Sequence, residues 1–202
     1  MKIDILFLNN ELDGHDKYFN NQLFKEYCET HSFEGKKNQI LSVPPSYSKS
    51  ENLTFLVGLG ENKEDNNFYN IGTLIGSNIK SDAEIKFLNI EGDTNLIIDG
   101  ILYVQYRFNN YKSEDDSSIN NITFKDIDSS ENEIKKNSVF WVRDLINTPA
   151  LDKSPEEFIN RVKELVDSSE IKVEVMIKSG LKKITLVLFW VLEKVPTGLH
   201  IF

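Results

Sequence analysis

The sequence of 202 residues is poor in the residue types that build several common functional sites. Its single cysteine, Cys28, excludes an internal disulfide, and three histidines, at positions 15, 31 and 200, are too few and too scattered for a Cys/His zinc cluster. Basic residues are also outnumbered, with 23 Lys and Arg against 32 Asp and Glu and a net charge of −9. That balance argues against a protein that neutralises the phosphates of nucleic acid.

Long apolar segments are scarce as well. The stretch 184–192 has only Thr185 as a polar residue, but it is far shorter than the roughly 20 apolar residues of a transmembrane helix. At the N-terminus, Asp4 interrupts what would be the apolar part of a signal peptide. We therefore expect no membrane partner and a cytoplasmic location.

Apolar residues make up 40% of the chain, which is enough for a hydrophobic core. The clearest strand is 53–58, a continuous apolar run that closes on Gly58-Leu59-Gly60 and is typical of a parallel strand covered on both faces. Strands interleaved with helices predict an α/β fold with a mainly parallel sheet. The predicted strands are 2–8, 39–43, 53–58, 84–90, 122–124 and 172–177, and the predicted helices are 17–29, 68–80, 93–108, 131–147 and 154–166.

The two C-terminal helices have clear start signals. Ser130 is the predicted cap of the helix 131–147, and Ser154 begins the next helix with Pro155 in its first turn and Glu157 closing a capping box. For the helix 131–147 we expect the core to take the residues Ile134, Val139, Val142, Leu145 and Ile146.

A few residues could carry chemistry, but a structural interpretation is favoured for each. Gly58-x-Gly60 after a strand could cradle a phosphate on backbone N–H groups, yet isolated glycines mostly serve backbone geometry. His15 and His31 lie in polar stretches and are predicted to be exposed and idle, whereas Cys28 lies on the apolar row of a helix and is predicted to be core. The acidic run 114–116 is predicted to be a solvated loop rather than a metal site.

Three ordered motifs are more specific. They are VGLG at 57–60, GILYVQYRFNNYK at 100–112, and RDLINTPA at 143–150 followed by SPEEF at 154–158. Together they resemble the leucine (cytosol) aminopeptidase family, in which such segments occur in the same order across the N-terminal domain and the crossing into the catalytic domain. The resemblance covers residues 2–183.

The resemblance implies a macro-domain-like N-terminal domain over 1–130, a connecting helix over 131–148 and the beginning of an aminopeptidase catalytic domain over 149–183, so the second α/β domain is incomplete. It implies peptide substrates, two divalent metal ions (Mn, Zn or Mg) and a homohexamer for the intact family protein. The family's metal ligands and catalytic residues lie downstream of the matched region. We therefore expect no catalytic, cofactor-binding or metal-binding residue in this chain, no bound metal and no hexamer, and we expect Arg143 and Asp144 to tie the helix to its neighbours.

Residues 184–202 depart from the family pattern. In a shifted reading frame, Phe189 followed by Trp190 forces Leu and Trp190 followed by Val191 forces Gly, and the other junctions permit the family's missing glycine- and proline-containing motif. Lys182-Lys183 is the natural place for a gained or lost base. The segment 184–202 is therefore interpreted as an out-of-frame tail.

These observations favour the N-terminal portion of a metal-dependent leucyl aminopeptidase that lacks the active site. The alternative is a free-standing macro-like module that binds a ligand or serves in assembly. A large apolar pocket beside Gly58 and Gly60 with convergent N–H donors would favour the alternative.

Overall fold

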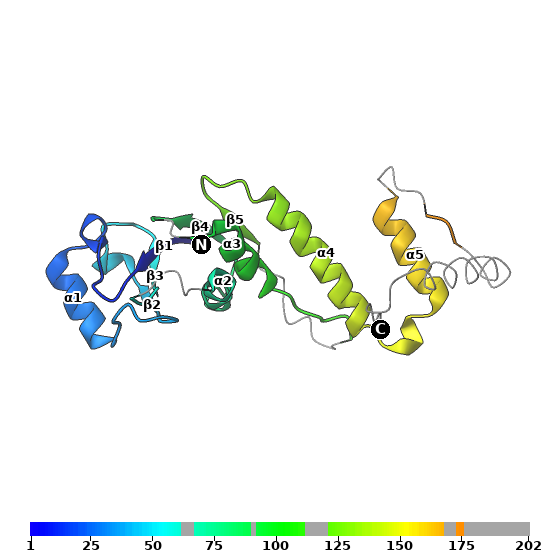
Figure 1. The fold of residues 1–202 in the computed structure, drawn as a ribbon, viewed down its shortest axis with the longest axis horizontal. Coiled ribbons are helices and arrows are strands. Elements are labelled where there is room, and N and C mark those ends of the chain that lie inside the picture. The colour runs from blue at the N-terminus through cyan, green and yellow to red at the C-terminus, as the bar shows by residue number, and fades with distance from the viewer. Residues whose placement is uncertain (62–66, 90–91, 112–120, 168–172, 176–202) are drawn as a thin grey trace, which may run out of the picture. The chain divides into compact units, whose positions relative to one another are not determined.

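The computed structural model describes residues 1–61, 67–89, 92–111, 121–167 and 173–175. Contacts divide the chain into two units, Met1–Asn147 and Thr148–Phe202. The regular elements are β1 (Lys2–Leu8), α1 (Asn21–Thr30), β2 (Ile40–Val43), β3 (Leu53–Gly58), α2 (Phe68–Ser77), β4 (Ala83–Phe87), α3 (Thr94–Tyr103), β5 (Ile122–Phe124), α4 (Ser130–Asn147) and α5 (Pro155–Val166), with short 3₁₀ turns at His15–Lys17, Pro45–Tyr47 and Ala150–Asp152 (Figure 1).

The first unit is built on a five-stranded sheet with the order β2-β3-β1-β4-β5. β1 pairs in parallel with β3 and with β4, and β4 pairs in parallel with β5, whereas the edge strand β2 is antiparallel to β3. The register aligns Ile3 with Leu53 on one side and with Ile85 on the other. The predicted α/β fold with a mainly parallel sheet is therefore confirmed.

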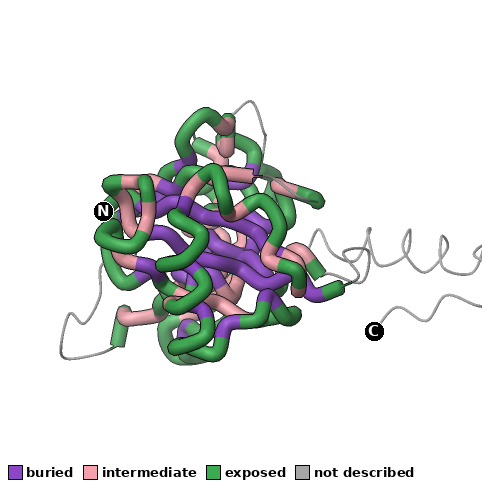
Figure 2. The backbone as a smooth tube through the Cα atoms, turned by 90° about the vertical axis from the view of Figure 1, so that its left-hand side faces the viewer, coloured by how far each residue is buried: buried purple, intermediate pink, exposed green. Residues whose placement is uncertain are grey.

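Helices cover both faces of this sheet, so alternate residues of β1 enter two different cores. Ile3, Ile5 and Phe7 pack in the cluster that contains the buried side chains of α2 and α3. Leu6 and Leu8 face the opposite way and pack with Phe24 of α1. Figure 2 shows the result as buried strands running through the middle of the unit between more exposed segments.

Glycine allows α2 and α3 to cross closely. A Cβ on Gly72 of α2 would lie 2.1 Å from the carbonyl oxygen of Ile97, and a Cβ on Gly100 of α3 would lie 2.2 Å from that of Tyr69. Such distances leave no room for a methyl group between two backbones. Gly100, the first residue of the motif at 100–112, thus serves helix packing. The helix that contains it ends at Tyr103, earlier than the predicted end near residue 108.

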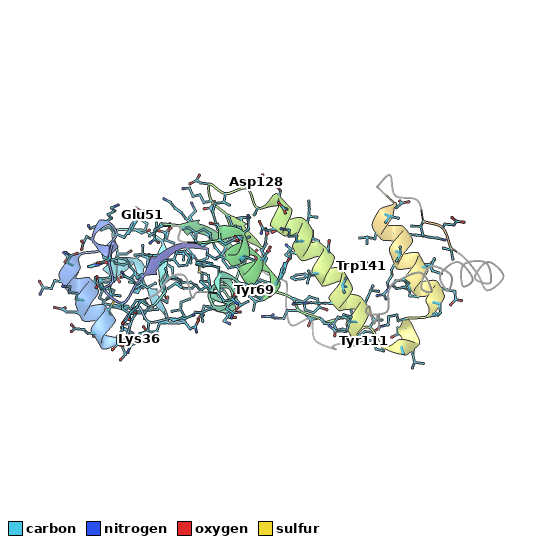
Figure 3. All side chains as sticks on the ribbon, in the orientation of Figure 1. Lys36, Glu51, Tyr69, Tyr111, Asp128 and Trp141 are labelled. Atoms are coloured by element: carbon cyan, nitrogen blue, oxygen red, sulfur yellow. The ribbon has the colours of Figure 1, made fainter. Side chains whose placement is uncertain are left out.

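α4 packs with a different face from the predicted one. Of the five apolar residues expected in the core only Leu145 is buried, whereas Ile134 and Ile146 are 67% and 70% exposed. The buried positions are instead Asn132, Phe140 and Leu145 (Figure 3 shows the side chains along α4). Asn132 donates from Nδ2 to the carbonyl of Asn95 (3.1 Å) and to Asp99 (2.8 Å), and these two bonds to α3 set the rotation of the helix.

The start of α4 also differs by one residue from the prediction. Ser130 lies inside the helix, where its N–H donates to Oδ1 of Asp128 at 3.0 Å. The first backbone bond of the helix runs from Glu133 to the carbonyl of Ser129. The backbone N–H and side-chain hydroxyl of Ser130 hold the pKa of the Asp128 carboxyl below its usual value, as expected of an acidic group at a helix start.

The second unit contains α5, whose predicted start is confirmed. The Ser154 side chain accepts a hydrogen bond from the Glu157 N–H at 3.2 Å, and Pro155 occupies the first turn. Arg161 pairs with Glu157 at 3.0 Å and reaches the Thr148 hydroxyl at 3.3 Å. Of the predicted strand 172–177, the residues Val173–Val175 are exposed and lie outside any strand, and the rest falls outside the described residues, as do the acidic run 114–116 and the segment 184–202.

Candidate functional site

The glycine-rich segment after β3, Gly58-Leu59-Gly60, is a candidate ligand site, because its backbone N–H groups could bind a phosphate. All three of these groups already donate to protein carbonyls. Gly58 donates to Gln39 (2.9 Å), Leu59 to Leu8 (2.8 Å) and Gly60 to Gly35 (2.9 Å). The interpretation as a plain strand-to-loop turn is therefore confirmed.

The two glycines of this segment serve different backbone needs. A Cβ on Gly58 would lie 2.1 Å from the carbonyl oxygen of Lys36, and Gly60 has a φ of 77°, in the left-handed region. Glycine at position 58 is thus required by the approach of the loop 35–39, and glycine at position 60 by the backbone conformation. The sequence could not show this, because the loop that fills the space precedes β3 by some twenty residues.

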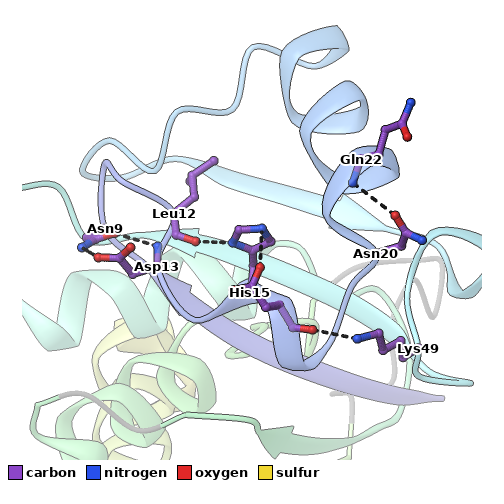
Figure 4. A network of polar contacts seen from close by, with 8 residues as sticks. Asn9, Leu12, Asp13, His15, Asn20, Gln22 and Lys49 are labelled. Atoms are coloured by element: carbon purple, nitrogen blue, oxygen red, sulfur yellow. Dashed lines mark hydrogen bonds and ion pairs between the residues drawn. The ribbon is translucent and has the colours of Figure 1, made fainter.

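His15 is largely buried, so the prediction that it is exposed is wrong. Its side chain is 12% exposed, and its ring stacks on Phe24 with the centroids 4.3 Å apart. Nδ1 donates to the carbonyl of Leu12 at 2.6 Å, and Nε2 lies 3.2 Å from Oδ1 of Asp16 (Figure 4). The His15 ring packs against the core cluster that contains Phe24 of α1. This role depends on the tertiary contact with Phe24.

His31 and Cys28 lie where they were expected. His31 is exposed at the end of α1, stacked on Tyr27. Cys28 is 2% exposed and packs with Phe24 and Leu56, and burial raises the pKa of its thiol to about 11. Since the thiolate is the reactive form of cysteine, this residue is an inert part of the core.

The two long motifs meet in space. Tyr106, from the motif at 100–112, donates from Oη to Oδ1 of Asp144 at 2.8 Å and accepts from Nδ2 of Asn147 at 3.0 Å. Arg143 stands over the Tyr106 ring at 5.2 Å and donates to the carbonyl of Tyr103 at 3.2 Å, and the ring of Phe140 meets the Tyr106 ring edge-on. Desolvation is the main reason that the pKa of Tyr106 is raised.

This group of side chains fastens α4 to the segment that follows α3. It confirms the expectation that Arg143 and Asp144 tie the helix to its neighbours. The Asp144 carboxylate is engaged by a phenol and the Arg143 guanidinium by a ring and a carbonyl, so both are used in packing. The sequence analysis did not predict that the two motifs contact each other. The only indication in the sequence is that one motif contains a phenol and the other a carboxylate, which can form a hydrogen bond.

Within the described residues, no group of three or more His, Cys, Asp or Glu side chains is arranged to hold a metal ion. The donor set of this part of the chain therefore does not fit the two-metal centre that the motif resemblance implies for the intact family protein. Over the same residues, no helix is long and apolar enough to cross a membrane.

Comparison with known proteins agrees with the motifs. No family model matches the sequence. A probable cytosol aminopeptidase of Clostridium tetani is 26% identical over 86% of this chain and 40% of that protein, and one of Nitrobacter winogradskyi is 27% identical over 79% of this chain and 37% of that protein. The chain thus spans about two fifths of the length of these curated relatives.

Solved structures show the same fold. A cytosol aminopeptidase from Coxiella burnetii matches with a TM-score of 0.68 and 20% identity over 91% of this chain and 39% of that one. A tomato leucine aminopeptidase mutant matches with a TM-score of 0.65 and 17% identity over 91% of this chain and 43% of that one. In sequence and in fold, the chain therefore resembles the N-terminal portion of the leucine (cytosol) aminopeptidase family.

Proposed function

We propose that the chain is the N-terminal portion of a metal-dependent leucyl aminopeptidase, and that it carries none of the residues that catalyse peptide hydrolysis or bind the metals. The observation that supports this most is the extent of the sequence similarity. It runs along 86% of this chain but along only 40% of the Clostridium tetani relative. The intact protein would remove N-terminal residues from peptides in the cytoplasm.

The chain's own contribution in this proposal is structural. The domain 1–130 supplies the folded α/β unit, the connecting helix 131–148 is fastened to it through Tyr106 and Asp144, and 149–183 begins the catalytic domain. In the intact protein two divalent metal ions would polarise the scissile carbonyl and activate water. Their ligands lie in the part of the family protein beyond the matched region, and the homohexamer is a property of that intact protein.

The direct test is a peptidase assay on the purified full chain, with the fold first verified by circular dichroism. We expect no hydrolysis of leucyl peptides with Mn²⁺, Zn²⁺ or Mg²⁺, while the Clostridium tetani relative serves as the active control. Metal-dependent turnover that persists through purification and co-elutes with the chain would contradict the proposal.

The out-of-frame origin of 184–202 is tested separately, at the level of DNA. We expect a gained or lost base near the codons for Lys182 and Lys183, and codons for metal ligands in the shifted frame beyond it. A protein translated through the corrected frame should gain leucyl aminopeptidase activity. If no frame beyond codon 183 encodes such a segment, the proposed origin of the tail is wrong.

No observation at the glycine-rich segment favours the alternative of a free-standing ligand-binding module. The N–H groups that would hold a phosphate donate to Gln39, Leu8 and Gly35. The glycine-rich segment therefore does not support the free-standing module.

A further inference from the structure

A charged hollow of about 310 Å³ opens on the first unit, where the first residues of β1 and β4 lie beside the loop that precedes β3. Its volume is at the lower end of the roughly 300–1,000 Å³ typical of ligand pockets. Its lining includes three carboxylates and three lysine amines, and its remaining members are Ser50 and Asn52. A hollow with such a lining suits a small charged ligand.

Asp4 is the buried carboxylate of this hollow. It interrupts an otherwise apolar strand and is 3% exposed. Ser50 donates from Oγ to Oδ2 at 2.5 Å and Asn52 donates from Nδ2 to Oδ1 at 3.2 Å, so the carboxylate is held in one orientation. A carboxylate accepts about four hydrogen bonds, and a buried charge is costly until it is matched by an opposite one. Asp4 therefore has the capacity to bind a cationic group.

Apart from one ion pair, the charged side chains around Asp4 form an acidic pair and a basic pair. Lys2 and Glu84 pair with each other at 3.7 Å. The two other carboxylates, Asp4 and Glu51, come from β1 and from the loop before β3 (Glu51 is labelled in Figure 3), whereas Lys86 and Lys125 come from β4 and from the residue that follows β5. Among the described residues, no ion pair within 4.0 Å joins either of these lysines to a carboxylate.

The acidic and basic residues of the hollow come from different parts of the sheet. Asp4 lies on β1 and Glu51 precedes β3, whereas Lys86 lies on β4, opposite Asp4 in the register, and Lys125 follows β5. Neighbouring strands are about 4.8 Å apart, so the backbone of Asp4 is one such spacing from that of Lys86 and two from that of Lys125. A simple anion would match the lysines but meet Asp4 and Glu51, and a simple cation would have the opposite conflict.

We propose that this hollow binds a small zwitterion, an amino acid or a dipeptide, with its ammonium group at Asp4 and Glu51 and its carboxylate at Lys86 and Lys125. Each charged end of such a ligand meets groups of opposite sign, and complementary charges of this kind give specificity. The site is distinct from the proposed peptidase chemistry, and its occupancy is measured by binding alone.

The test is an amide chemical-shift titration of the full isotopically labelled chain with L-leucine and with leucylleucine at millimolar concentration. We expect saturable shifts at Ser50, Asn52 and Lys86. Leucinamide lacks the carboxylate and N-acetylleucine lacks the ammonium group, so each should bind at least about tenfold more weakly. Comparison of the two zwitterions distinguishes the free amino acid from the dipeptide.

Variants locate the site. Glu51→Gln and Lys125→Gln change exposed side chains and should each weaken binding several-fold without loss of stability. Glu29→Gln and Lys25→Gln make the matched changes on exposed positions of α1, outside the hollow, and should leave binding unchanged. The absence of saturable shifts with both zwitterions would overturn the proposal. Equal shifts with N-acetylleucine or with inorganic phosphate would also overturn it, because they would indicate a site for anions.

Discussion

Gly100 stands where α3 comes closest to α2. In a helix, replacement of glycine by alanine normally adds up to about 1 kcal/mol of stability, because alanine loses less backbone entropy on folding. Here the added methyl group would lie 2.2 Å from the carbonyl oxygen of Tyr69 and 2.8 Å from the backbone nitrogen of Thr73. The steric conflict involves backbone atoms, so neither helix can yield by turning a side chain.

For Gly100→Ala we therefore expect a loss of about 1–3 kcal/mol in the free energy of unfolding, measured by urea denaturation. Ser77→Ala, an exposed change at the end of α2, is the control and should alter this energy by less than about 0.5 kcal/mol. A stabilised Gly100→Ala variant would show that the two helices do not approach this closely.

Cys28 makes stability depend on pH on the alkaline side. Its pKa is raised from 9.0 to about 11 by burial, so the unfolded chain releases the thiol proton at a lower pH than the folded chain. The stability that this difference contributes is complete below pH 9 and is lost as the pH rises towards 11. The loss amounts to about 1.4 kcal/mol per pH unit in that window.

We expect the midpoint of thermal unfolding to fall between pH 8.5 and about 10.5 more steeply in the native chain than in Cys28→Ala, although the variant starts from a lower stability. Tyr103 and Tyr106, whose pKa values are also raised, add a slope that both proteins share. The pKa of Tyr27 is raised mainly by burial and in part by Cys28, so a small part of its slope disappears with Cys28. Parallel curves for the two proteins would contradict the assignment of this slope to Cys28.

α4 shows how one polar residue can set the orientation of an element. The apolar residues of this helix fall on more than one row, so the amphipathic pattern alone did not identify the buried face. Asn132 bonds to α3 through Asn95 and Asp99, and Phe140 packs on Tyr106. These contacts place Leu145 inside and leave Ile146 exposed.

Two adjacent substitutions test this rotation. Leu145→Ala removes a side chain that is 8% exposed and should cost about 2–4 kcal/mol in the free energy of unfolding. Ile146→Ala removes one that is 70% exposed and should change this energy by no more than about 0.5 kcal/mol. Similar costs in denaturant titrations of the two variants would indicate that Ile146 is also packed.

The contact units of the chain divide after Asn147, and α4 belongs to the first of them. A boundary at residue 130 would remove Asn132, Phe140 and Leu145 and expose the apolar and polar groups that they cover on α3 and Tyr106. Tertiary contacts, rather than the helix's own propensity, supply most of the stability of such an element.

We therefore expect limited proteolysis to leave a core that ends near residue 147, and a chain of residues 1–147 to unfold cooperatively in urea. A chain of residues 1–130 should unfold at clearly lower urea concentration. Equal midpoints for the two chains would show that α4 adds no stability to the sheet unit.

Deletion of 184–202, which removes a run of seven apolar residues, is expected to improve solubility.

Much of the secondary structure could be predicted from the sequence alone, and the family resemblance could be recognised from it. The limits of β1, β3 and β5 match the predicted ranges, because a buried parallel strand is a continuous apolar run and needs no distant information to be seen. Ser154 was identified as a cap because its partner, Glu157, is three residues away. Features of this kind depend on residues close together in the sequence, so a local pattern predicts them.

The roles that could not be predicted depend on partners far apart in the sequence. The N–H groups at Gly58 and Gly60 are engaged by Gln39 and Gly35, His15 is buried by Phe24, and α4 is oriented through Asn132 by α3. The sequence shows Asp4 as a polar residue within an apolar segment, but its burial and its bonds to Ser50 and Asn52 depend on the tertiary structure. The other residues of the hollow, among them Ser50 and Lys125, are far apart in the sequence. They come together because parallel pairing brings distant strands into register, and no local sequence pattern predicts that pairing.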